Sequence, residues 1–316
     1  MKLKQRPMLI LALAITLLLV LEFVYYMYVN NREEPIRQVS LIVYGSDTSR
    51  WENLRQGAEL AAEDMNAEVT LITMSTEDDA LEQISLIERE IENGADALLI
   101  AACDSEAVGS YMKHTDLKIP YVFVESGTEE AGLIAADDAR MADSLARTID
   151  ENEKDWIKVA LIADHTERDS VRRRLEGMLN PEVVYANEIV LWERNDQEKN
   201  KKAQFFLQRE LTEEAVDVVV ALDNSSMEEL LDATVNLDKD IKIYGIASSN
   251  KSVYYLDNRL IKSLVYQDEF SVGYLGLKEL LSGGTTDGNA QINYEVVAHD
   301  ELYEPAYQKL LFPHVR

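Results

Sequence analysis

Residues 39–65, VSLIVYGSDTSRWENLRQGAELAAEDM, contain the unit that decides the predicted fold. The first seven, VSLIVYG, form a short apolar run without strict alternation, which is typical of a parallel strand buried on both faces. Apolar side chains then recur at helical spacing and predict one buried helix face: Leu54, Ala58, Ala61, Ala62 and Met65. A strand followed by such a helix indicates one βα unit.

The same unit recurs along the chain in two series. Candidate strands begin near 39, 68, 95 and 120, and again near 158, 183, 216 and 241. The second series repeats the first at an offset of roughly 115 to 121 residues. Repeated strand–helix–strand units give right-handed crossovers and a doubly wound sheet. The sequence therefore predicts an α/β fold with two similar parallel-sheet lobes.

Two further candidate strands near 261 and 292 flank a predicted helix over 269–282. They allow the chain to cross between the lobes again, which predicts a hinge with several crossings. The expected division is an N-terminal lobe of 39–137 plus 268–294 and a C-terminal lobe of 138–267 plus 295–316.

An apolar run precedes these lobes. Residues 8–28, MLILALAITLLLVLEFVYYMY, carry one charge, Glu22. As a helix the run would reach about 31 Å, enough to cross a bilayer core. Basic residues precede it, so the positive-inside rule places 1–7 in the cytoplasm as a tail, 8–28 in the membrane as an anchor and 29–38 outside as a stalk. We therefore expect a single-pass protein of the cell membrane with an extracytoplasmic C-terminal domain.

The alternatives for 8–28 are a cleaved signal peptide and a buried core helix. A signal peptide usually has a shorter apolar region and a small-residue exit, whereas this run ends in tyrosines that suit an interfacial aromatic belt. The only cysteine, Cys103, is far from the run, which excludes a lipoprotein signal.

Composition narrows the function classes. The chain has 58 acidic and 31 basic residues and a formal net charge of −27, so it repels phosphate backbones and nucleic acid is not an expected partner. One cysteine allows no internal disulfide. The four histidines and the cysteine show no metal-ligand spacing, and we expect neither metal nor cofactor.

Candidate site residues follow the predicted strands, because ligands of open α/β sheets bind beyond the carboxyl ends of the strands. The segments there mix carboxylates, amides, arginines and tryptophans. Such a mixture suits a polyhydroxylated small molecule, whose apolar ring face stacks on aromatics while planar side chains bond its hydroxyls. These segments include Glu125 and Asp138.

Several stretches together resemble the type I periplasmic binding proteins, in particular their ribose- and galactose-binding branch. They span about 39–290 in family order and include LIVYGSDTSRWENLRQGAELAA, ENGADALLIAACDSEAV, ERDSVRRRLEGM, VDVVVALDN and IKSLVYQDEFSVGYLGLKEL. The resemblance implies a non-enzymatic binding protein whose two lobes close on a small ligand such as a monosaccharide or similar polyol. It also implies a membrane partner that reads the closed form, either an ABC permease or a sensor histidine kinase.

The resemblance also implies ligand-binding positions. Carried over by position, they are Asp47, Arg50, Trp51, Asp104, Arg172, Trp192, Asp223 and Gln267. One departure concerns Ala247, which stands where the ribose-binding branch has an aspartate and which leaves the ligand's identity open.

Structural roles remain open for several of these residues. Asp104 is also a good helix N-cap, and Trp51 also suits packing of a helix start. Of Arg172, Arg173 and Arg174, most are expected on a solvated helix face. Glu125 is an alternative partner for Arg50 or Arg172 when the cleft is empty.

Other function classes fit less well. A lac-repressor-type regulator needs a basic helix-turn-helix, and an enzyme needs a nucleophile or phosphate-binding motif that the sequence does not show. A degenerate lobe pair that binds no ligand and serves as an interaction module remains the alternative, because of Ala247.

Overall fold

The computed structural model describes residues 5–30, 35–128, 132–153, 156–180, 188–199, 201–235, 237, 239, 241–283, 292–305 and 307. The chain divides into two units, Met1–Ile36 and Arg37–Arg316. The first unit contains helix α1 (Gln5–Asn30). The second contains the remaining elements and the candidate site.

The single-pass membrane localisation expected from the run at 8–28 is contradicted by the structure. A membrane crossing requires about 20 consecutive, predominantly apolar residues in one helix. Within the described part of the chain, where the side chains of α1 run from 13 to 27, no helix has the length and apolar character to span a bilayer. The expected single-pass localisation in the cell membrane is corrected accordingly.

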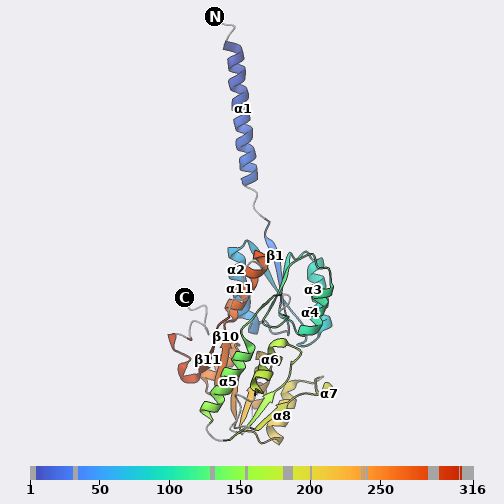
Figure 1. Cartoon of the computed structure of the whole chain (residues 1–316), viewed down its shortest axis with the longest axis vertical. Coiled ribbons are helices and arrows are strands. Elements are labelled where there is room, and N and C mark those ends of the chain that lie inside the picture. Colours follow the sequence, from blue (N-terminus) through green and yellow to red (C-terminus); the bar gives the residue numbers. More distant parts are fainter. Residues whose placement is uncertain are drawn as a thin grey trace. The chain divides into compact units, whose positions relative to one another are not determined.

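The second unit consists of two lobes, each built on its own sheet (Figure 1). The first sheet has the strand order β2-β1-β3-β4-β5 and is parallel throughout. Its strands are β1 (Arg37–Val43), β2 (Ala67–Thr73), β3 (Ala97–Ile100), β4 (Tyr121–Val124) and β5 (Leu133–Ile134). Its helices are α2 (Glu52–Asp64), α3 (Ala80–Glu92), α4 (Ser105–His114) and α11 (Glu269–Ser282), with a 3-10 turn at Ser49–Trp51.

The second sheet has the order β11-β10-β9-β8-β6-β7. Its strands are β6 (Lys158–Ile162), β7 (Glu188–Trp192), β8 (Val218–Ala221), β9 (Lys242–Ile246), β10 (Ile261–Gln267) and β11 (Tyr294–Ala298). Its helices are α5 (Asp138–Asn152), α6 (Asp169–Met178), α7 (Asp196–Lys199), α8 (Ala203–Glu213), α9 (Asn224–Thr234) and α10 (Asn250–Asp257), and a 3-10 turn follows β11 at His299–Glu301.

The predicted two-lobed α/β class is confirmed, with two differences. Strand β11 runs antiparallel to β10, so the second sheet is not wholly parallel. Strand β5 was not predicted, because two residues are too few to produce a periodic signal. The first part of the strand predicted near 183 lies outside the described residues, and β7 is described from Glu188. The exact lobe boundaries stay a prediction.

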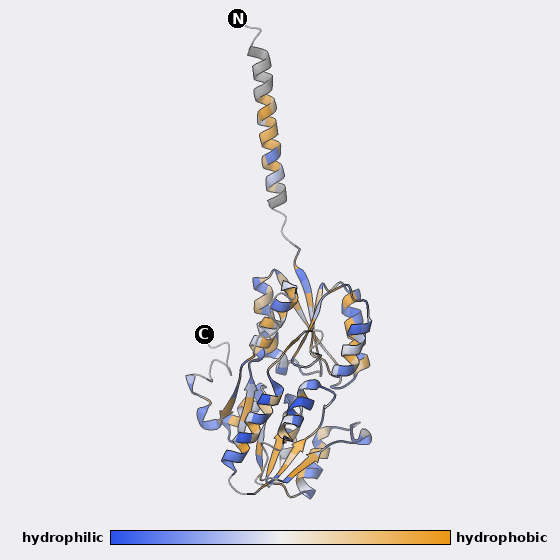
Figure 2. Ribbon diagram, viewed as in Figure 1, coloured by the Kyte–Doolittle hydropathy of each residue, from blue (hydrophilic) through white to orange (hydrophobic). Residues whose placement is uncertain are grey.

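Alternate side chains of the central strands enter separate cores, as expected for strands covered on both faces. In β6, Val159 and Leu161 belong to one buried cluster, whereas Ala160 and Ile162 belong to another that includes residues of α8 and α9. Figure 2 shows apolar residues along several strands of the second sheet, whereas polar and apolar residues alternate along the helices.

Helix α11 packs tightly on α2, although the two are far apart in sequence (Figure 1). The close approach requires glycine on both helices. A Cβ added to Gly57 would lie 1.9 Å from the carbonyl oxygen of Phe270, and one added to Gly273 would lie 1.9 Å from that of Leu54. The first residue of α11, Glu269, lies just beyond the carboxyl end of β10.

Candidate functional site

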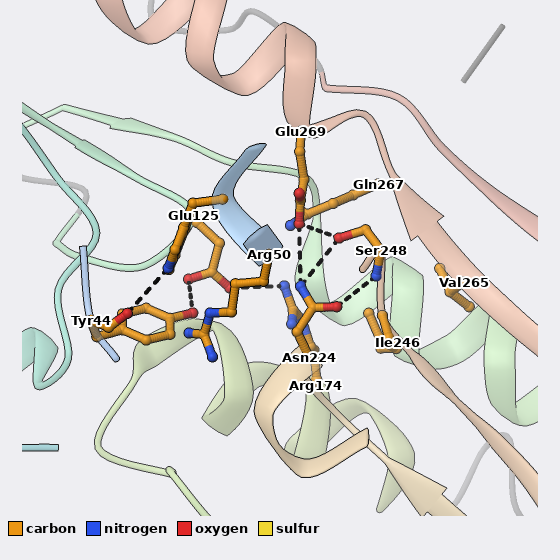
Figure 3. Close-up of a pocket in the computed structure, with 12 residues that line it drawn as sticks. Tyr44, Arg50, Glu125, Arg174, Asn224, Ile246, Ser248, Val265, Gln267 and Glu269 are labelled. Carbon is orange, nitrogen blue, oxygen red and sulfur yellow. Dashed lines mark hydrogen bonds and ion pairs between the residues drawn. The ribbon is translucent and has the colours of Figure 1, made fainter. Parts of the chain in front are cut away.

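A small pocket lies where the carboxyl ends of strands from both sheets meet. The first lobe contributes Tyr44, Arg50, Trp51, Glu125 and Glu269 to its lining. The second lobe contributes Arg174, Asn224, Ile246, Ala247, Ser248, Val265 and Gln267. Figure 3 shows labelled side chains from both lobes around the pocket, with Tyr44 and Glu125 on one side and Ser248 and Ile246 on the other.

Aromatic rings form one wall. The Tyr44 and Trp51 rings meet edge to face at 4.9 Å between centroids, and Trp51 Nε1 donates a 3.1 Å hydrogen bond to the Tyr44 carbonyl. The Arg50 guanidinium lies over both rings, 4.6 Å from the Tyr44 centroid and 5.0 Å from that of Trp51. Trp51 therefore both packs the start of α2 and lines the pocket.

Glu125 joins the two lobes at the pocket. Its carboxylate accepts hydrogen bonds from the Tyr44 hydroxyl at 2.8 Å and from the Ser170 hydroxyl of the second lobe at 3.1 Å. Arg174 Nη2 lies 3.5 Å from the same carboxylate. The backbone of Glu125 has φ +64°, a left-handed conformation that disfavours a residue with a Cβ and that is typical of functional positions.

Arg174 is the arginine of α6 that reaches the pocket. Its side chain is buried, its Nε donates to Asp138 at 2.7 Å, and its Nη1 donates to the Leu222 carbonyl at 3.0 Å. Burial raises the pKa of Asp138 to about 7, against the opposing effect of Arg174. Arg172 instead lies on the outer face of α6, where its side chain is 53% exposed and pairs with Asp169.

A second group of charges connects the lobes beside the pocket. We call Glu77, Asp78, His165, Arg168 and Asp223 the Arg168 cluster. Arg168 is fully buried, and its guanidinium contacts Glu77 at 2.7 Å, Asp78 at 3.0 Å and Asp223 at 2.8 Å. His165 Nδ1 lies 2.8 Å from Asp78. Since Glu77 and Asp78 follow β2 whereas His165 and Arg168 follow β6, these contacts hold the lobes together.

Glu77 occupies a central place in this cluster. Besides Arg168, it contacts Arg50 at 3.2 Å and accepts a 3.1 Å hydrogen bond from the Ser225 hydroxyl. Burial acts to raise the pKa of Glu77, but Arg50 and Arg168 overcome it and lower that pKa. Arg50 also donates to the Ser225 hydroxyl at 2.6 Å, so both Arg50 and Glu77 of the first lobe contact the start of α9.

The structure brings some of the predicted site residues together and separates others. Arg50, Trp51, Glu125 and Gln267 line the pocket. Asp138 accepts a hydrogen bond from Arg174, which lines the pocket. Asp223 caps α9 by accepting from Ser226 N, and it also pairs with Arg168.

Six predicted residues lie outside the lining: Asp138, Arg172 and Asp223, described above, and also Asp47, Asp104 and Trp192. Asp47 is exposed and accepts hydrogen bonds from the backbone and hydroxyl of Ser49, and Asp104 caps α4 through Ala107 N. Trp192 belongs to the core of the second lobe, and its Nε1 donates to Glu214 at 2.8 Å.

Sequence reasoning missed several pocket and cluster residues, among them Glu77, Asp78 and Glu269. Glu77 and Asp78 follow the predicted strand near 68, and the rule that sites lie at strand ends applies to them as well. Glu269 is the first residue of a helix that follows a strand, and the same rule would have found it.

No group of histidine, cysteine and acidic residues within the described part of the chain is arranged to hold a metal ion. What the arrangement can do is enclose a small polar molecule between aromatic faces, amides and carboxylates contributed by both lobes.

Two α/β lobes with a polar pocket between their strand ends define a bilobed ligand-binding domain. Residues 39–282 match the family described as "Periplasmic binding protein domain", and the chain belongs to this family. The predicted family is thereby confirmed, whereas its ribose- and galactose-binding branch is not. A search of the curated proteins found no match.

Solved structures share the fold. A carbohydrate transporter solute-binding protein from Agrobacterium radiobacter, in complex with D-arabinose, is 20% identical, with a TM-score of 0.73 over 88% of this chain and 100% of that one. An ABC transporter solute-binding protein from Agrobacterium vitis with bound D-fucose is 17% identical, with a TM-score of 0.76 over 87% and 100%. A carbohydrate transporter from Acidothermus cellulolyticus in complex with myo-inositol is 15% identical, with a TM-score of 0.72 over 89% and 100%.

Proposed function

We propose that this protein is a solute-binding protein that encloses a monosaccharide or similar polyol between its lobes and delivers it to an ABC importer. The observation that carries the proposal is the pocket itself. Its lining comes from both lobes and combines Tyr44 and Trp51 with Arg174, Asn224 and Gln267. Aromatic faces and planar hydrogen-bonding groups are the chemistry that recognises a sugar ring and its hydroxyls.

The structural relatives support the ligand class. The solved proteins of the same fold carry D-arabinose, D-fucose and myo-inositol, and one is described as an ABC transporter solute-binding protein. The importer is the partner we propose on that basis. A sensor histidine kinase as the reader of the closed form stays a prediction from the sequence.

Thermal unfolding of the full chain in a panel of neutral sugars and polyols tests the proposal. A ligand that binds only the folded state adds about 2.7 kcal/mol at 100 times its dissociation constant. We expect a pentose, hexose or cyclitol to raise the melting temperature by several degrees. Absence of a shift across the panel would contradict the proposed function.

A ligand-free interaction module is the second candidate, and one observation favours it. The charges around the cleft already have partners within the protein, since Glu77 joins Arg50 to Arg168 and Glu125 meets Arg174. The same thermal panel separates the two candidates, because an interaction module gives no response to any small molecule.

A further inference from the structure

Two buried oxygen atoms in the pocket lack hydrogen-bond partners. They are Oε1 of Gln267 and Oε2 of Glu269, and both residues line the pocket. Gln267 is 6% exposed and Glu269 is 4% exposed. A buried polar atom without a partner costs free energy, so two of them in one pocket indicate groups that a ligand satisfies.

The position of the Glu269 carboxylate is fixed by its other oxygen. Oε1 accepts hydrogen bonds from the Ser248 hydroxyl and from Asn224 Nδ2, the latter at 3.3 Å. Asn224 is itself held by the backbone, because its Oδ1 accepts from Ser248 N at 2.7 Å and from Ser249 N at 3.0 Å. Figure 3 shows Asn224, Ser248 and Glu269 joined in this way, with Gln267 beside them.

The hydrogen bonds among Asn224, Ser248 and Glu269 place a carboxylate at the end of β9, where Ala247 provides none. Glu269 comes from the first turn of α11 in the other lobe. Its reach to Ser248 follows from the pairing of β10 with β9, in which Val265 lies opposite Ile246, so that the two strands end side by side.

The charges of the pocket determine which ligand suits these two oxygens. Arg50 pairs with Glu77 at 3.2 Å, and Arg174 pairs with Asp138 at 2.7 Å, so both lining cations have carboxylate partners. Among the described residues, no salt bridge involves Glu269. Neither cation of the pocket lining is therefore free for an anionic ligand. Burial raises the pKa of Glu269 to about 7. Above that pH, where the carboxylate is charged, the two oxygens require hydrogen-bond donors.

We propose that Glu269 is the specificity-determining carboxylate of the pocket, accepting a hydrogen bond from a hydroxyl of a neutral polyhydroxylated ligand while Gln267 Oε1 accepts one from a second hydroxyl. The proposal rests on the proposed function and narrows its ligand class to neutral sugars and polyols. Sugar acids are expected to bind more weakly, because both lining arginines already pair with carboxylates of the protein and leave none to neutralise an added carboxylate.

Calorimetric titration of the full chain tests this assignment. The probes are D-fucose, D-arabinose and myo-inositol as neutral ligands and D-galacturonate as an acid that shares the galacto configuration of D-fucose. The wild type is expected to bind at least one neutral probe and to bind D-galacturonate at least about tenfold more weakly than D-fucose. Glu269→Gln should weaken neutral-probe binding about 10- to 100-fold, the loss expected for one hydrogen bond to a charged group.

A matched control lies on the same helix. Glu279→Gln makes the same change in the last part of α11, away from the pocket lining, and should leave the dissociation constant unchanged. If Glu269→Gln does not fold, Glu269→Asp keeps the charge and withdraws the carboxylate by one methylene, and the same loss of affinity is expected.

The outcomes separate the two proposals. Unchanged affinity in the Glu269 variants, or D-galacturonate binding as tightly as D-fucose, would overturn the role of Glu269 while leaving the sugar-binding function standing. A wild type that binds none of the four probes would overturn both.

Discussion

Substitution of Glu77 is the most direct way to weaken the contacts between the two lobes. Glu77 lies in the first lobe, and two of its contacts cross to the second, to Arg168 at 2.7 Å and to the Ser225 hydroxyl at 3.1 Å. Glu77→Gln keeps the size of the side chain and removes its charge. Because the buried pair of Arg168 and Asp223 lies within the second lobe, that lobe keeps its own ion pair.

The expected change in the free energy of closing follows from how exposed the contact between Glu77 and Arg168 is. The Arg168 side chain is fully buried, but that of Glu77 is 31% exposed, so solvent partly screens the pair. A charged hydrogen bond in a buried site contributes about 1.5–3 kcal/mol, and an exposed ion pair about 0–1 kcal/mol. The change should therefore shift the closing equilibrium by about 1–2 kcal/mol, which is roughly 5- to 30-fold toward the open form.

Single-molecule fluorescence transfer between the lobes measures that shift. Dyes on cysteines introduced at Leu81 and Phe205 would report on lobe separation, since these residues are 77% and 63% exposed and belong to different lobes. The native Cys103 is fully buried and should not compete for label.

Without ligand, the wild type is expected to populate mainly the high-transfer state, and Glu77→Gln to increase the low-transfer state. Glu63→Gln removes the same charge from an exposed position of α2 and should match the wild type. Identical distributions for Glu77→Gln and the wild type would refute the reasoning that this carboxylate holds the lobes together.

Three further predictions concern the pocket, the packing and the effect of pH. Arg174→Lys loses the guanidinium that contacts both Asp138 and Glu125, and it should weaken sugar binding about tenfold or more by calorimetry. Arg172→Ala, on the exposed face of the same helix, should change the affinity less than twofold. Gly273→Ala should destabilise the protein by about 1–3 kcal/mol in urea unfolding, since its Cβ would meet a backbone carbonyl. Lys278→Ala, on the exposed side of α11, should leave the unfolding free energy unchanged. Burial raises the pKa of Glu229 from 4.5 to about 7, so its contribution to stability is present below pH 4.5 and is lost as the pH rises to 7. Glu229→Gln should therefore flatten the decline in unfolding free energy between pH 5 and pH 7.5, and an unchanged slope would contradict this cause.

Acidic pH should reveal the opposite effect at Asp78. Burial acts to raise the pKa of Asp78, but its hydrogen bond with His165 and its contact with Arg168 lower it well below the ordinary value. Its stabilising contribution is thus complete above about pH 4 and is lost as the pH falls further. Together with Glu229, this places the expected maximum of stability near pH 5.

The architecture was predictable because it rests on short-range patterns. Apolar runs such as VDVVVALD and the helical spacing in α2 predicted β8 and α2, and the helix predicted over 269–282 coincides with α11. Antiparallel pairing of β11 could not be predicted in this way, since direction within a sheet depends on the path of the chain between lobes and not on periodicity.

The choice of arginine shows where pattern reasoning stops. Three arginines follow one another in α6, and the sequence does not show which of them faces inward. The choice is made by the docking of α6 on α5, where a Cβ on Gly177 would lie 2.7 Å from that of Ala142. That contact turns Arg174 toward the pocket and leaves Arg172 in solvent.

Trp192 and Asp104 show a related limit. Both residues lie at the ends of predicted strands, but each side chain makes a contact within its own lobe. Trp192 donates a hydrogen bond to Glu214, and Asp104 caps the first turn of α4. A strand-end position establishes proximity to the cleft, whereas the direction of a side chain depends on the pleat of the strand and the capping of the next helix.

A crystal structure of the full chain with the neutral sugar that gives the largest thermal shift would test the account most directly. We predict the sugar between Trp51 and Gln267, with one hydroxyl within hydrogen-bond distance of Glu269 Oε2 and another near Arg174. A sugar bound outside the cleft, or a cleft closed by the protein's own ion pairs with no sugar in it, would contradict the conclusion that these two lobes form a sugar-binding pocket.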